Sequence, residues 1–187
     1  MTKEVEREIK KIYQSPDGKV FFAQDGSIAS QARILMNSLT SKFNDMFGRS
    51  AQLMAEKMVG QADKASKASL ANSLKDMAGM TINTNVTSAD LKDTMKSRIA
   101  ENVALIKSIP QQYLDRIGGT VYRSITSGQG LADLMPQIQK YGEMTETRAK
   151  TIALDQTRKT MQGGTADRLN KIGVKQFEWV HSGGSRF

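Results

Sequence analysis

The sequence predicts a mainly α protein of the α+β class, in which a long helical arm precedes a compact helical head with a short C-terminal β element. Three observations predict this fold. Apolar residues recur every three to four positions over most of the 187 residues, which is the spacing of amphipathic helices. Aromatic residues make up only 6 %, which favours a core of Leu, Ile, Ala and Met. Alternation of apolar and polar residues, the pattern of a strand, is confined to short stretches such as residues 174–181.

Composition bounds the classes of function. The chain has no cysteine, which excludes disulfides, thiol nucleophiles and Cys-ligated zinc. No apolar run approaches the ~18 residues of a membrane-spanning helix, and the charged start of the chain does not resemble a signal peptide. The net charge of +8 is spread along the chain, which is typical of a basic surface without a dedicated patch. We therefore expect neither a membrane partner nor a small-molecule substrate or cofactor.

Residues 1–26 are predicted to form an N-terminal helix-and-turn element. Val5, Ile9 and Tyr13 share one face of a helix over residues 2–14. The run Ser-Pro-Asp-Gly at residues 15–18 is a strong turn signal, and a short strand over residues 19–24 follows it.

Residues 27–108 are predicted to form the arm. Apolar residues from Ile28 onward mark a long helix over residues 27–60, with a bend near Gly48. An alanine- and serine-rich helix continues over residues 62–77 and ends at Gly79, and residues 80–86 have the β-branched alternation of an extended segment. A further helix is predicted from Ser88 to Lys107.

Residues 109–187 are predicted to form the head. Pro110 is expected to open a helix that reaches Ser127 and stops at Gly128. A short helix over residues 131–141 is expected to break at Gly142, and Thr145 is expected to cap a third helix over residues 146–172. Gly173 suits the positive φ that follows a helix, and the strand over residues 174–181 carries Trp179.

The third helix of the head carries the most informative run of the chain. Its small and apolar positions share one face, which predicts close packing against a neighbour; they are Ala149, Ile152, Ala153, Gln156, Thr160 and Gly164. Asp155 and Lys159 stand four residues apart, as in a helical ion pair. The run resembles the C-terminal signature of the phage head-morphogenesis family, the minor head proteins similar to protein F of phage Mu. The residues that carry the resemblance are Arg148, Ala149, Ile152, Ala153, Asp155, Gln156, Lys159, Gly173 and Trp179.

The resemblance continues upstream, in the alanine-rich helix and in the string from Glu101 to Tyr113, so that it covers residues 27–180 intermittently. It implies a minor head protein of a tailed phage or prophage that acts in head morphogenesis and procapsid assembly near the portal. The partners it implies are the portal, other head proteins and non-specifically bound double-stranded DNA. The implied location is the virion, in the head interior or at the portal vertex, and the host cytoplasm during assembly. The family continues with an Arg and a later His, whereas this chain ends at Phe187, directly after Arg186, so the head domain looks truncated.

The residues themselves favour interaction over catalysis. His181 is the one histidine, and it lies in no spacing that would bind zinc or assist a nucleophile. We therefore predict no enzymatic activity and no metal or cofactor site. Two alternatives stay open, namely a nucleic-acid-binding protein unrelated to heads and the remnant of a toxin or hydrolase. A pocket lined by Asp155, Gln156 and His181 would favour the hydrolase, and the phosphate contacts of a DNA-binding protein would come from Arg148, Lys150, Arg158 and Lys159.

Overall fold

The computed structural model describes residues 1–14, 26–79, 81, 83 and 89–174. They form four helices, namely α1 (Thr2–Tyr13), α2 (Gly26–Ala78), α3 (Ala89–Ser127) and α4 (Leu131–Lys171). The prediction of a mainly α fold is thus confirmed. Over these described ranges there is no strand. The predicted strand over residues 19–24 lies outside the described residues, as does all but the first residue of the predicted strand over 174–181 and most of the extended segment over 80–86.

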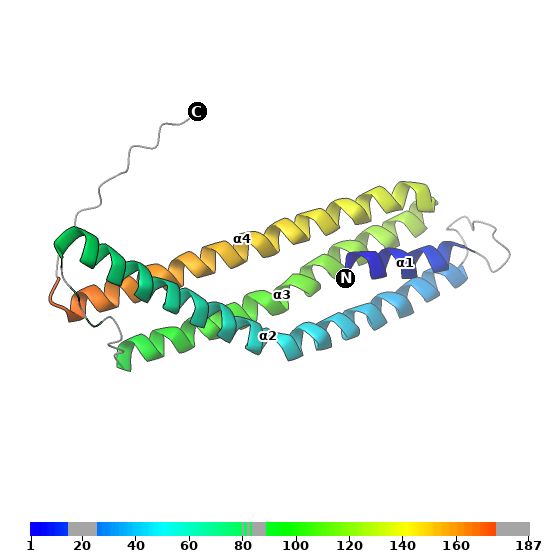
Figure 1. Ribbon diagram of the computed structural model, residues 1–187. Coiled ribbons are helices and arrows are strands. Elements are labelled where there is room, and N and C mark those ends of the chain that lie inside the picture. Colours follow the sequence, from blue (N-terminus) through cyan, green and yellow to red (C-terminus); the bar gives the residue numbers. More distant parts are fainter. Residues whose placement is uncertain (15–25, 80, 82, 84–88, 175–187) are drawn as a thin grey trace, which may run out of the picture.

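The molecule is elongated because three of its helices are long. At 1.5 Å per residue, the 53 residues of α2 span roughly 80 Å, and α3 and α4 span roughly 60 Å each. Figure 1 shows α2, α3 and α4 running side by side, with the short α1 against the half of the molecule in which α2 begins and α3 ends. Figure 1 also shows α2 bent near its middle, the region in which Gly48 predicted a bend. The Ser50 hydroxyl donates to the Met46 carbonyl there (3.0 Å), a bond that bends helices.

The main hydrophobic core lies in the half of the molecule that contains α1. It is built from large side chains of all four helices, among them Tyr13, Phe43, Tyr113, Leu114, Ile117 and Ile138. Val5 and Ile9 of α1 belong to this core, as their spacing predicted. Residues 1–14 thus pack directly into the body of the molecule.

The other half has a smaller, more polar interior. Its apolar cluster consists of Ala51, Ala55 and Ile106 with a few half-buried neighbours. Farther along α2, the small side chains of Ala62 and Ser66 are buried. Small residues let the helix axes approach closely, but they bury little apolar area and so contribute less hydrophobic free energy than the large core.

Several predicted helix boundaries are wrong, because packing outweighs local signals. Pro110 does not begin a helix: α3 runs continuously across it, held by buried residues on both sides such as Ile106 and Tyr113, although an interior proline costs ~3 kcal/mol. The predicted boundary between arm and head at residue 108 therefore falls inside α3, and the division of the chain into an N-terminal element, an arm and a head stays a prediction. Gly142 does not break α4, nor does Thr145 cap a helix, since its hydroxyl donates to the Tyr141 carbonyl within α4 (2.7 Å).

Gly142 instead provides room for α1. A Cβ atom at this position would lie 2.5 Å from Thr2 Cγ2, far inside van der Waals contact. The predicted stops at Gly79, Gly128 and Gly173 are confirmed, and all three have positive φ (61°, 69° and 89°), which glycine adopts without strain.

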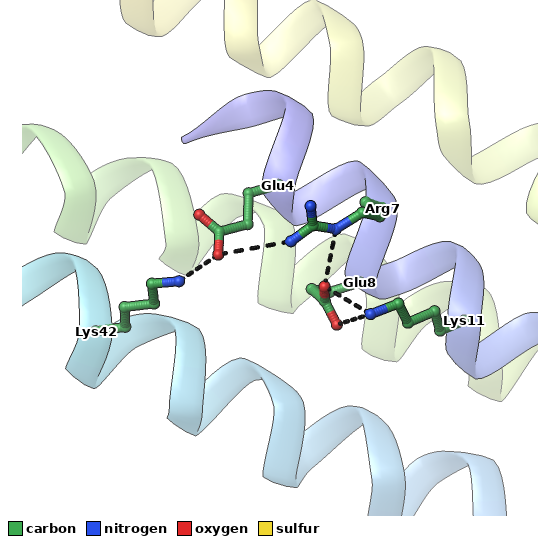
Figure 2. Close-up of polar contacts among 5 residues, drawn as sticks. All are labelled: Glu4, Arg7, Glu8, Lys11 and Lys42. Carbon is green, nitrogen blue, oxygen red and sulfur yellow. Dashed lines mark hydrogen bonds and ion pairs between the residues drawn. The ribbon is translucent and has the colours of Figure 1, made fainter.

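An ion pair on the surface joins α1 to α2, and others lie within α1. Figure 2 shows Lys42 of α2 donating to the Glu4 carboxylate of α1, while Arg7 and Lys11 donate to Glu8 within α1 (3.0 and 2.9 Å). The bond from Lys42 is the main reason that the pKa of Glu4 lies below its ordinary value. These exposed pairs are worth little individually, so the apolar face of α1 supplies most of its attachment.

Candidate functional site

The residues of the sequence signature divide between the interior and the surface of α4. Gln156, Thr160 and Gly164 are buried, as their common face predicted. Ala149 and Ile152 are half-buried, whereas Ala153 is exposed because a groove separates this part of α4 from α2. Arg148, Asp155 and Lys159 are exposed, Gly173 ends the helix, and Trp179 lies outside the described residues.

A buried polar cluster joins the second half of α4 to α2. Arg168 of α4 is only 2 % exposed and donates to the Asp63 carboxylate and to the Ser66 hydroxyl (3.2 Å) of α2. The Ser66 hydroxyl also lies 2.8 Å from the Thr165 hydroxyl. Lys67 pairs with the second oxygen of Asp63 (2.9 Å). Burial alone would raise the pKa of Asp63, but the bonds from Lys67 and Arg168 outweigh it and hold the pKa below its ordinary value.

Gly164 makes this cluster possible. A Cβ atom there would lie 2.8 Å from Arg168 Nη1 and 3.3 Å from Ser66 Oγ. At the neighbouring Gly163 a Cβ atom would meet nothing within 4 Å. Of the two adjacent glycines, therefore, only Gly164 is required by the packing of α4 on α2.

A second polar contact joins α4 to α3. The Gln156 amide donates to the Glu101 carboxylate (2.9 Å), which also pairs with Arg98 (3.2 Å). The bond from Gln156 is the main reason that the pKa of Glu101 is lowered. Asp155 takes no part in this contact, since it forms the predicted ion pair with Lys159 (2.7 Å) on the surface. Asp155 and Gln156 thus point to different surroundings, and His181 lies outside the described residues, so nothing here favours the hydrolase.

The four side chains predicted to contact phosphates are all exposed, but two are neutralised. Lys150 pairs with Glu146 (2.8 Å) and Lys159 with Asp155 (2.7 Å). Arg148 and Arg158 have no carboxylate partner within the part of the chain that the structure describes. Of these four residues, therefore, the two arginines carry the positive charge that is available to a polyanion.

An apolar groove of about 690 Å³ lies where the middles of α2, α3 and α4 meet the start of α1. Its apolar lining includes Met54 and Met58 of α2, Ile106 and Ile109 of α3, and Ala149 and Ile152 of α4. Glu6, Glu143 and Glu146 lie among the polar residues of its lining, together with Lys3. Methionine and small residues suit a surface that adapts to a partner. We name this feature the apolar groove.

Sequence reasoning assigned most methionines to the core and so missed the groove. The signal that could have indicated it is the pair Met54 and Met58, which stand four residues apart and so share one face of α2. Large apolar side chains also lie exposed beside the groove, with Leu53 at 70 % and Met54 at 52 %. The described helices include none long and apolar enough to cross a membrane.

Comparison with known proteins gives one relative in Haemophilus influenzae, described only as an uncharacterized protein. The two are 32 % identical over 185 residues, which cover 97 % of this chain. The chain spans about 40 % of the length of that relative, so it resembles one part of a longer protein. No protein-family model matches the chain, and no solved structure matches it.

Proposed function

We propose that the chain is a minor head protein of a tailed phage or prophage, which binds other head proteins near the portal during head morphogenesis and procapsid assembly. It would reside in the virion, in the head interior or at the portal vertex, after assembly in the host cytoplasm. The resemblance of the α4 signature to the head-morphogenesis family supports this proposal. The structural observation that carries its protein-binding part is the apolar groove with the exposed residues beside it.

The groove supports a protein partner because its lining is costly to leave in water. Burying apolar surface contributes about 25 cal/mol per Å², and exposed clusters of large apolar side chains mark sites of interaction. Ala149 and Ala153 on one wall leave room for a helix to approach closely, while Met54 and Met58 on the other can repack around it. Such a site is suited to hold an apolar helix face.

Co-purification from lysates that contain assembling particles tests this function. The tagged chain is expected to carry portal and head proteins with it. Ala153→Arg, which places a charged side chain in the groove, should abolish this association. Ala132→Arg is the matched control, because Ala132 is also an exposed alanine of α4 but does not line the groove. A wild-type chain that stays free of portal and heads would refute the proposal.

Contact with packaged DNA is the second part of the proposal, and Arg148 and Arg158 carry it. Both are exposed, and neither has a carboxylate partner among the described residues. If each contacts one phosphate, Arg148→Gln/Arg158→Gln should lower the slope of log K against log salt by about 2. Lys150→Gln, which removes a cation already paired with Glu146, should change the slope less. An absence of DNA binding at low salt would exclude this part and leave the role in assembly untouched.

A further inference from the structure

We infer that a second copy of this chain occupies the apolar groove and presents the outward face of its own α2. The inference rests on the proposed function only in that the groove is taken to bind protein; the second copy occupies the groove in the free chain, and a head protein displaces it during assembly. It is carried by two surfaces of the described residues, an apolar face with basic residues on α2 and an apolar groove with acidic residues beside it.

The first surface is a stripe along the outward face of α2. Met46, Leu53, Lys57 and Lys64 are separated by seven, four and seven residues, the spacing of one helix face. Met46 and Leu53 are 42 % and 70 % exposed, which is unusual for two large apolar residues on one stripe. Lys57 and Lys64 are exposed, and neither forms an ion pair with another described residue. We name these four residues the α2 stripe.

The second surface is the apolar groove, whose charge is opposite to that of the α2 stripe. Three carboxylates belong to its lining, against two cationic groups, the side chain of Lys3 and the amino group of Met1, so the groove is locally acidic although the chain carries a net charge of +8. Glu6 and Glu143 form no ion pair within the described part of the chain. Glu146 pairs only with Lys150, and both side chains are about 70 % exposed (69 % and 71 %), so this pair can exchange partners. An apolar helix with basic residues thus fits the groove in shape and in charge.

The two surfaces adjoin each other on the same molecule. Met54, which is 52 % exposed, follows Leu53 of the α2 stripe and itself lines the groove. A two-fold axis through this region places the stripe of each copy against the groove of the other, so both grooves are filled at once. Because the interface is used twice, the assembly closes as a dimer and does not continue as a filament.

Sedimentation velocity or light scattering across a range of concentrations tests this arrangement. The wild-type chain should form a dimer, and raising the salt concentration should weaken it. Lys57→Glu/Lys64→Glu and Glu143→Lys/Glu146→Lys should each weaken the dimer at least ~10-fold by placing like charges together. The quadruple variant, which carries both reversals, should regain most of the lost affinity, since the opposite charges then meet again. This recovery also shows that the double variants fail by charge and not by misfolding.

An apolar variant tests the stripe independently. Leu53→Asp should abolish the dimer, whereas Ile34→Asp should preserve it. Ile34 is 65 % exposed on the same helix but lies roughly 29 Å away along the axis. A monomer at all concentrations, a dimer indifferent to both charge reversals, or equal loss in Leu53→Asp and Ile34→Asp would overturn the inference.

These results are distinguishable from those for the proposed function. A chain that co-purifies with heads but stays monomeric refutes the second copy and leaves the head protein standing. A dimer that responds to the charge reversals but never associates with heads refutes the head protein and leaves the second copy in the groove standing.

Discussion

The adjacent glycines of α4 allow a sharp test of the buried cluster around Arg168. We predict that Gly164→Ala destabilises the protein and that Gly163→Ala stabilises it. Both variants add one methyl group to the interior of the same helix, where alanine is favoured over glycine by ~1 kcal/mol. They differ in what the methyl group meets, because only at Gly164 does it lie 2.8 Å from Arg168 Nη1.

The magnitude follows from the surroundings of Arg168. A flexible side chain at the surface would move aside at little cost, but Arg168 is 2 % exposed and its guanidinium is held by Asp63 and Ser66. Breaking a buried ion pair outright costs about 3–5 kcal/mol, and overpacking a core typically costs about 1–3 kcal/mol. After the gain in helix propensity, we expect Gly164→Ala to lower the free energy of unfolding by about 1–3 kcal/mol. The two variants should therefore differ by about 2–4 kcal/mol.

Urea unfolding followed by far-ultraviolet circular dichroism measures this difference, provided that the slope with urea is the same in both variants. In an Arg168→Met background, which removes the guanidinium, Gly164→Ala should lose most of its cost. Equal stability of Gly164→Ala and Gly163→Ala would refute the reasoning. An unchanged cost in the Arg168→Met background would show that Arg168 is not what the methyl group displaces.

Three further predictions concern stability. Asp63→Asn should lower the free energy of unfolding by about 3–5 kcal/mol, because it leaves Arg168 charged and buried. The control is Asp93→Asn, in the exposed pair with Lys96, which should lower it by less than about 1 kcal/mol in the same urea assay. Burial raises the pKa of Tyr113 to about 12, so this phenol ionises in the unfolded chain at a lower pH than in the folded protein. The free energy of unfolding should therefore fall as the pH rises from about 10 to 12. Thermal melts at alkaline pH should show a smaller fall for Tyr113→Phe. Gly142→Ala should displace α1, because the new methyl group overlaps Thr2, and should increase proteolysis within residues 1–14 while α2–α4 stay intact.

The sequence predicts those features of the fold that depend on residues of one short segment. The apolar face of α1 and the ion pair between Asp155 and Lys159 follow from spacings of four residues, and the glycine stops at the helix ends follow from the positive φ that glycine adopts without strain. Predictions from single residues failed at Pro110, Gly142 and Thr145. Each is a local break or cap signal, and each lies in a helix whose flanking turns are held by side chains from other helices. The energy of that packing exceeds the local preference, and it cannot be seen in a short window of sequence.

The candidate site was less predictable because it depends on contacts between distant segments. Arg168 and Asp63 stand 105 residues apart, and neither has a neighbour in sequence that indicates a buried partner. The walls of the apolar groove come from all four helices, so that residues as distant in sequence as Glu6, Met54 and Ala149 line it together. Sequence reasoning identified Ala149 and Ile152 as facing inward, but it could not indicate that the space in front of them is open.

The two halves of the molecule differ in their interiors, and we expect them to differ in local unfolding. Large side chains fill the half that contains α1, whereas small residues and one charged cluster hold the second halves of α2 and α4 together. Amide hydrogen exchange in the native state should therefore divide a single continuous helix into two zones. Amides near Phe43 should exchange only on global unfolding, and those near Ser66 through a partial opening of lower free energy. In such a partial opening, the first half of α2 stays packed in the main core while its second half separates from α4.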